Sequence, residues 1–158
     1  MRQDPVSNSD DVSSIDAIIN AAYAVISGPA GQPRDWERER ALFLPGARCI
    51  PTAVKAADNE SALAPQFLDV EAYIARVEPL FREKGFYETE ITRRTEEFGQ
   101  IAHVWSTYES RHSPDDTEPF MRGINSFQLF HDGKRWWIVN IFWQHESADH
   151  PLPKLYLG

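Results

Sequence analysis

One stretch of the sequence, FMRGINSFQLFHDGKRWWIVNIFWQ (residues 120–144), predicts a long β-hairpin. Apolar and polar residues alternate on both sides of its centre, and β-branched and aromatic side chains are frequent, as is typical of strands. Asp132-Gly133 is a strong hairpin signal, because glycine readily adopts the positive φ that a tight turn requires. We therefore expect strands over Phe120–His131 and Arg135–Gln144.

Two segments before this hairpin have the same period of two. They cover about Tyr87–Thr95 and Ile101–Arg111, and Phe98-Gly99-Gln100 is expected to form the turn between them. The polar loop Ser113–Pro119 then leads into the hairpin. Four consecutive strands with short links predict an antiparallel meander.

The residues before position 86 have a helical period instead. Apolar side chains recur at i, i+3, i+4 and i+7 over Ile15–Ile26, which predicts one helix packed on a core. A second, short helix is expected over Asp35–Leu42 and a third over Asp69–Lys84. Pro79 lies within the third and is expected to kink it or end it early.

Helices followed by an antiparallel meander predict an α+β fold, with three N-terminal helices on one face of a mixed or antiparallel sheet. Long strands twist strongly, so we expect a cone-shaped, strongly curved sheet with an interior cleft, a cystatin-like roll. A short edge strand over Ala47–Pro51 and a loop over 52–65 complete the expected elements. The domain is expected to cover 13–146, between a flexible arm at 1–12 and an irregular tail at 147–158.

Composition excludes several classes of protein. Of 158 residues, 42% are hydrophobic, which is too many for a disordered chain, and the net charge of −8 argues against nucleic-acid binding. No apolar run is long enough to span a membrane, and no apolar stretch follows Arg2 as in a signal peptide. With Cys49 as the one cysteine and no metal or phosphate motif, we expect a cytoplasmic globular domain without a cofactor or metal.

Two motifs stand out, Ala41-Leu42-Phe43-Leu44-Pro45-Gly46-Ala47 and the hairpin formed by Arg122–Leu129, Asp132-Gly133 and Arg135–Val139. Both resemble motifs of the nuclear transport factor two-like superfamily, in particular its SnoaL-like polyketide cyclases and ketosteroid isomerases. The order of elements matches over residues 14–146. This superfamily includes enzymes, adaptors, assembly domains and binding proteins, so the resemblance predicts the fold more closely than the chemistry.

The resemblance also implies site residues. In the ketosteroid isomerases, a Tyr near the end of the first helix and an Asp in the penultimate strand form an oxyanion hole. These positions match Tyr23 and Asn125 here, and both side chains carry a hydrogen-bond donor. The position of the general-base Asp matches Pro51, which cannot accept a proton. The resemblance therefore leaves the isomerase mechanism without its usual base.

Strand alternation and the match to the family define an expected pocket. An inward Asn125 brings Phe127 to the same face, and the match places further residues inward: Ser106, Tyr108, Trp137, Val139, Ile141 and Trp143. Such an aromatic-lined pocket is typical of a site for a small apolar or aromatic molecule. The alternative is that these aromatic side chains simply fill the core, as in a non-catalytic interaction or assembly domain.

The opposite face is expected to form a homodimer interface, as it often does in this superfamily. Trp105, Thr107, Glu109 and Arg122 lie on it, and Trp and Arg are enriched in interfaces. If the register were inverted, His103 and Glu109 would enter the cavity as acid and base, which is the hypothesis of a hydrolase or dehydratase. The three hypotheses are thus a SnoaL-like binder or isomerase/cyclase, an assembly domain, and a His103-dependent enzyme.

Overall fold

The computed structural model describes residues 8–56 and 58–158, in which helices precede most of the sheet. The helices are η1 (Ser9–Val12), α1 (Ile15–Ile26), α2 (Trp36–Leu42), α3 (Val70–Glu83) and η2 (Lys154–Tyr156), where η marks a 3₁₀ helix. The strands are β1 (Phe43–Pro51), β2 (Val54–Ala56), β3 (Asn59–Ala64), β4 (Tyr87–Phe98), β5 (Ile101–Arg111), β6 (Met121–His131) and β7 (Trp136–His145).

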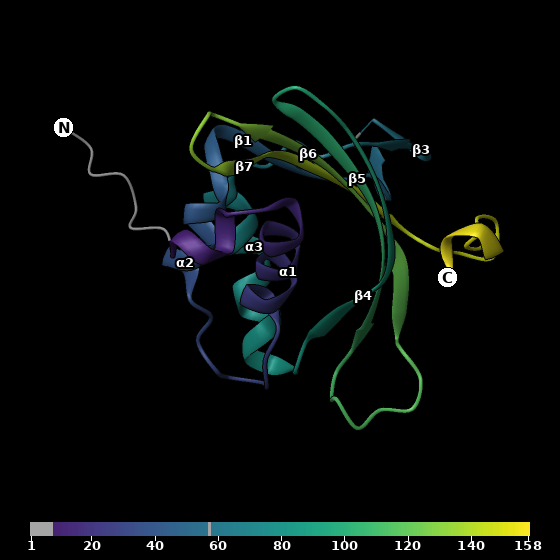
Figure 1. Ribbon diagram of the computed structural model, residues 1–158. Coiled ribbons are helices and arrows are strands. Elements are labelled where there is room, and N and C mark those ends of the chain that lie inside the picture. The colour runs from purple at the N-terminus through teal and green to yellow at the C-terminus, as the bar shows by residue number, and fades with distance from the viewer. Residues whose placement is uncertain (1–7, 57) are drawn as a thin grey trace.

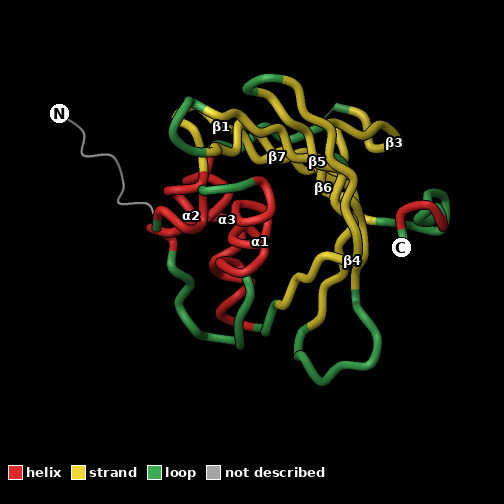
Figure 2. Tube along the Cα trace, in the orientation of Figure 1, coloured by secondary structure: helices red, strands yellow, loops and turns green. Residues whose placement is uncertain are grey.

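The main sheet has the order β1-β7-β6-β5-β4. Strands β4 to β7 form the expected antiparallel meander, and β1 pairs with β7 in parallel, so the sheet is mixed. It curves strongly around the three α-helices, which lie on its concave side, while the C-terminal segment lies on the other side (Figure 1; Figure 2). The α+β class, the three helices and the curved, open sheet are confirmed.

Local sequence accounts for where each α-helix begins. Ser14, Asp35 and Asp69 each precede a helix and accept a hydrogen bond from the backbone N–H three residues later, at 2.7–3.0 Å. This capping satisfies one of the backbone donors that a helix N-terminus leaves unpaired. The apolar stripe of α1 is buried, with Ile18 and Ile19 fully enclosed, so burial holds the helix against the sheet.

Pro79 does not end or visibly shorten α3, which continues to Glu83. Its missing N–H removes one hydrogen bond, whereas Ile74 and Phe81 on either side are buried and hold both halves of the helix on the core. Packing on both sides of the proline therefore lets the helix continue, and it does not end early.

Other boundaries differ from expectation. Strand β1 begins at Phe43, before the expected edge strand at Ala47; its pairing with β7 is irregular between Phe43 and Arg48, where Gly46 has a φ of 90°. The expected loop over 52–65 contains the small hairpin β2–β3. Val12 is only 3% exposed and joins the core, so packing reaches into the expected arm, whose residues 1–7 lie outside the described residues.

A bulge in β7 changes which of its side chains face the helices. Phe127 pairs with Ile141, but Leu129 pairs with Ile138, so the register shifts by one residue within β7. One inserted residue moves the side chains before it to the opposite face. Ile138 is consequently fully buried, and the side chain of Trp137 points away from the core.

Trp137 instead completes the turn at the end of the hairpin. Its Nε1 donates to Asp132 Oδ2 at 2.9 Å, and the Arg135 guanidinium lies 3.5 Å from the centre of its ring. The expectation that Trp137 and Val139 line the pocket is therefore wrong, because it assumed that inward and outward side chains alternate without interruption along this strand.

Candidate functional site

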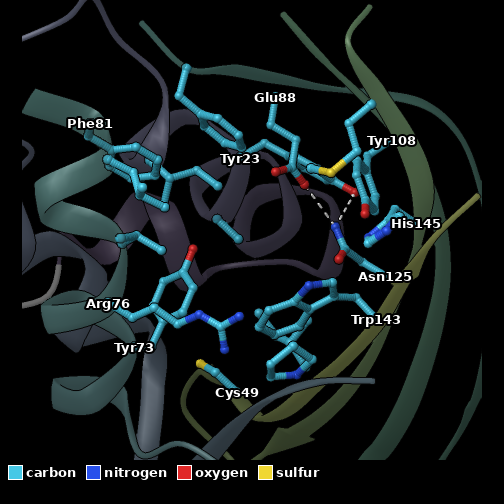
Figure 3. Close-up of a pocket in the computed structure, with 18 of the residues that line it drawn as sticks. Tyr23, Cys49, Tyr73, Arg76, Phe81, Glu88, Tyr108, Asn125, Trp143 and His145 are labelled. Atoms are coloured by element: carbon cyan, nitrogen blue, oxygen red, sulfur yellow. Dashed lines mark hydrogen bonds between the residues drawn. The ribbon is translucent and has the colours of Figure 1, made fainter. Parts of the chain in front are cut away.

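A cavity of about 500 Å³ lies between the helices and the concave face of the sheet. This volume is typical of small-molecule sites, which range over about 300–1,000 Å³. Its wall is mostly apolar and aromatic (Figure 3), and it includes the predicted residues Tyr23, Tyr108, Asn125, Phe127, Ile141 and Trp143. These residues come from α1, β5, β6 and β7, so the curvature of the sheet brings them together.

Tyr23, Ser106 and Asn125 form one buried hydrogen-bonded chain. The Asn125 amide Nδ2 lies 3.1 Å from the Tyr23 hydroxyl, which lies 2.6 Å from Ser106 Oγ. Ser106 in turn donates to the Glu90 carboxylate, which pairs with Arg93. The predicted Ser106 therefore supports the cavity from behind Tyr23 and does not line it.

The direction of these hydrogen bonds follows from counting protons. Because the single proton of Ser106 goes to Glu90, the proton of Tyr23 must go to Ser106. The second N–H of Asn125 donates to Glu88 Oε1 at 3.0 Å. The structure thus brings Tyr23 and Asn125 together. However, their hydrogen-bond donors are all engaged within the protein, whereas the donors of an open oxyanion hole point at the ligand.

Glu88 is the main residue that the sequence analysis missed. It lies on β4, lines the cavity, and has the amide of Asn125 as a neighbour (Figure 3). Removal from water raises the pKa of its carboxyl to about 7, and the hydrogen bond from Asn125 offsets part of that rise. In sequence it belongs to a charged strand whose composition predicts exposure to solvent. Glu88 and Glu90 are two residues apart and therefore share one face of the strand, which is the signal that the sequence contains.

A second carboxyl, that of Glu39 on α2, also lines the cavity. Its side chain is 3% exposed, and Oε2 has no hydrogen-bond partner among the described residues. Burial, followed by repulsion from Glu88, raises its pKa to about 8. The spacing of Trp36, Glu39 and Leu42 along α2 places this glutamate on the apolar face, which is a signal that the sequence contains.

Three other titratable groups of the cavity wall retain their protons at neutral pH. Burial raises the pKa of the Cys49 thiol and of the Tyr73 and Tyr23 hydroxyls far above their ordinary values. Pro51, which the resemblance placed at the position of the general base, does line the cavity. The carboxyls of Glu39 and Glu88 are thus the buried acids of this wall with a pKa near 7, and His112 and His145 also line the cavity.

His103 is on the other face of the sheet. Ser106 and Tyr108 face inward, so the odd-numbered residues of β5 face outward, and the His103 side chain is 53% exposed beside Glu96. Glu109 also lies outside the cavity and pairs with Arg111. The inverted register that would make His103 and Glu109 an acid–base pair in the cleft is therefore wrong.

The outer face contains the residues of the predicted interface. Trp105 is 41% exposed and its ring lies 6.1 Å from that of Tyr156 in the C-terminal segment, whereas Thr107 is fully buried. Glu109 is opposite Arg122 in the strand register, but Arg122 Nε donates to Glu146 Oε1 at 2.6 Å. The tail thus covers part of this face, and Glu109 and Arg122 pair with Arg111 and Glu146 and not with each other.

Several solved structures with the same fold are NTF2-like proteins or have a cystatin-like fold. An NTF2-like protein of unknown function from Pseudomonas putida KT2440 has a TM-score of 0.62 and 13% identity, over 89% of this chain and 92% of that chain. An uncharacterised protein with a cystatin-like fold from Caulobacter vibrioides has a TM-score of 0.59 and 14% identity, over 87% and 90%. The yeast UBP3-associated protein Bre5 has a TM-score of 0.56 and 12% identity, over 84% and 93%.

The chain therefore has the nuclear transport factor two-like fold that its motifs resemble. No protein-family model matches the sequence, and neither does any curated protein. At such low identity the likeness extends to the fold alone, and the chemistry must be argued from the site. Within the described residues, no helix is long and apolar enough to cross a membrane.

Proposed function

We propose that this protein binds a small, largely apolar ketone in its cavity and transfers a proton on it, as a SnoaL-like isomerase or cyclase would. The observation that carries the proposal is the Glu88 carboxyl, which lies in an apolar cavity with the Asn125 amide 3.0 Å away. A general base works best when its pKa is close to the working pH, and that of Glu88 is raised to about 7.

The two carboxyls of the cavity suit different roles. Their environments raise the pKa of Glu39 to about 8 and that of Glu88 to about 7, so Glu88 ionises first as the pH rises. A carboxyl that stays protonated in an apolar site can donate a hydrogen bond to an oxygen on which negative charge develops. Glu39 is thus the proposed donor, and Glu88 the proposed base.

The reaction would proceed in two balanced steps. The Glu88 carboxylate removes a proton from a carbon next to the carbonyl, while the Glu39 carboxyl donates a hydrogen bond to the carbonyl oxygen. Glu88 then returns the proton to the same or a conjugated carbon, which exchanges or isomerises the ligand. Asn125 orients Glu88, and Tyr23 and Ser106 hold Asn125 in place.

The exchange of α-protons for deuterium tests this proposal. 2-Tetralone, a bicyclic aromatic ketone, is dissolved in D₂O and its α-protons are followed by proton NMR with and without the protein. We expect acceleration over buffer, and a loss of about 10²-fold or more for Glu88→Gln, in the range measured for general bases. Glu97→Gln, an exposed change on the same strand, is the matched control. Exchange no faster than in buffer contradicts the proposal.

We also propose self-association through the outer face of the sheet. Trp105 and Phe142 are 41% and 47% exposed there, and large apolar side chains exposed together often mark an interface. This proposal concerns assembly and is independent of the proton transfer.

A further inference from the structure

The arginine on the cavity wall differs from most other arginines of this chain. Arg38, Arg40, Arg82, Arg93, Arg111 and Arg122 each pair with a carboxylate. Arg76 of α3 lines the cavity, and its hydrogen bond in the described part of the chain goes from Nη1 to the neutral side chain of Gln66, at 2.6 Å. In this acidic protein, such an arginine has donors left for another partner.

The position of Arg76 suits a ligand that extends toward solvent. Its guanidinium is directed into the cavity between the ring of Tyr73 and Trp143 (Figure 3), yet the residue as a whole is exposed. It therefore lies where the apolar interior meets water. Glu83 and Lys84, which also line the cavity, carry opposite charges.

The structure assigns to Arg76 the carboxylate of a keto acid. The guanidinium is planar and matches a carboxylate with two parallel hydrogen bonds, which a point charge such as lysine does not provide. Because burying an unpaired charge is costly, the apolar ring system would occupy the interior and the carboxylate would remain at the wet rim beside Arg76. This assignment rests on the proposed function, since it names the class of ketone that the same cavity takes.

Two matched probes test the assignment. 6-Carboxy-2-tetralone and its methyl ester share the ring system and the ketone and differ in the charged group. Isothermal titration calorimetry gives the Kd of each, and the NMR exchange assay gives its turnover. We expect the acid to bind the protein about 10–100-fold more tightly than the ester, the range for hydrogen bonds to charged groups.

Variants separate Arg76 from general charge effects. Arg76→Gln is expected to remove the preference for the acid and to leave the Kd of the ester unchanged. Arg82→Gln removes the same charge from the same helix, outside the cavity, and is expected to retain the preference. Equal binding of acid and ester to the unmodified protein, or equal effects of the two variants, would overturn the assignment.

The two readouts also separate this inference from the proposed function. If the acid binds more tightly through Arg76 but neither probe exchanges its α-protons, the carboxylate site stands and the proton transfer fails. If both probes exchange but bind equally well, the proton transfer stands and the carboxylate site fails.

Discussion

The Asn125 amide on β6 donates a hydrogen bond to the Glu88 carboxyl on β4, with 3.0 Å between Nδ2 and Oε1. The two strands are separated in the sheet by β5, so the contact spans the concave wall of the cavity. This hydrogen bond stabilises the ionised carboxylate and lowers the pKa that burial raises. Burial and, against it, this amide thus determine the pH at which Glu88 can accept a proton.

Replacement of this amide should shift the pH dependence of exchange. In Asn125→Ala the carboxylate loses its donor, so the pKa of Glu88 should rise above its value of about 7 and the inflection of the exchange rate should move to higher pH. The measurement is the rate of 2-tetralone exchange as a function of pH. Gln128→Ala, an exposed change on the same strand, should leave the inflection in place. An unchanged inflection in Asn125→Ala would show that Glu88 is not the titrating base.

Glu39 should make the fold less stable as the pH rises. Its pKa is raised from 4.5 to about 8 in the folded protein, so between these values the folded state keeps a proton that the unfolded state has lost. The free energy of unfolding therefore falls with rising pH across this window. Glu39→Gln removes that fall, because the amide does not ionise.

The measurement is the Tm at about pH 5 and about pH 9. We expect Glu39→Gln to raise the Tm at the higher pH by roughly 4–8 °C relative to the unmodified protein, corresponding to about 2 kcal/mol, and to change it little at the lower pH. Glu37→Gln on the exposed side of the same helix is the control. Equal shifts at both pH values would contradict the raised pKa.

Loss of the Tyr23 hydroxyl should affect stability more than catalysis. The hydroxyl donates its proton to Ser106 and accepts a hydrogen bond from the Asn125 amide. Tyr23→Phe removes both hydrogen bonds, which should lower the free energy of unfolding by about 1–3 kcal/mol. Because Tyr23 does not offer this proton to a ligand, we expect the exchange rate to fall by less than about 10-fold. A donor to the reacting oxygen would cost about 10²–10³-fold. A loss of that size in the NMR assay would show that Tyr23 donates to the reacting oxygen, as the resemblance implied.

The outer face should hold two copies together. Light scattering on the chain is expected to give twice its mass of 18.1 kDa. Trp105→Glu places a charge in the exposed apolar patch and should give the monomer mass, whereas Glu97→Gln should not. A mass of 18.1 kDa for the unmodified chain would contradict the proposal.

Local sequence was sufficient for the three α-helices, the four strands of the meander and their order. The stripe of α1, the cap residues of the three helices, the Asp132-Gly133 turn and the alternation of β5 and β6 each depend on neighbours a few residues apart. Such short-range preferences can be recognised in a single sequence. Together with the resemblance to the nuclear transport factor two-like superfamily, they placed Tyr23, Tyr108, Asn125 and Phe127 on the inner side, where these residues line the cavity.

Only the tertiary structure decided the chemistry of the cavity. The bulge in β7 turned Trp137 outward while Trp143 still faces inward, because one residue without a partner reverses the alternation between them. Glu39 and Glu88 are far apart in sequence and lie in charged segments, so their burial appears only when α2 packs against the curved sheet. The sequence by itself determined the three α-helices, the strands of the meander and most of their apolar faces. Packing decided which carboxyls are removed from water, and therefore which of them can carry a proton near pH 7.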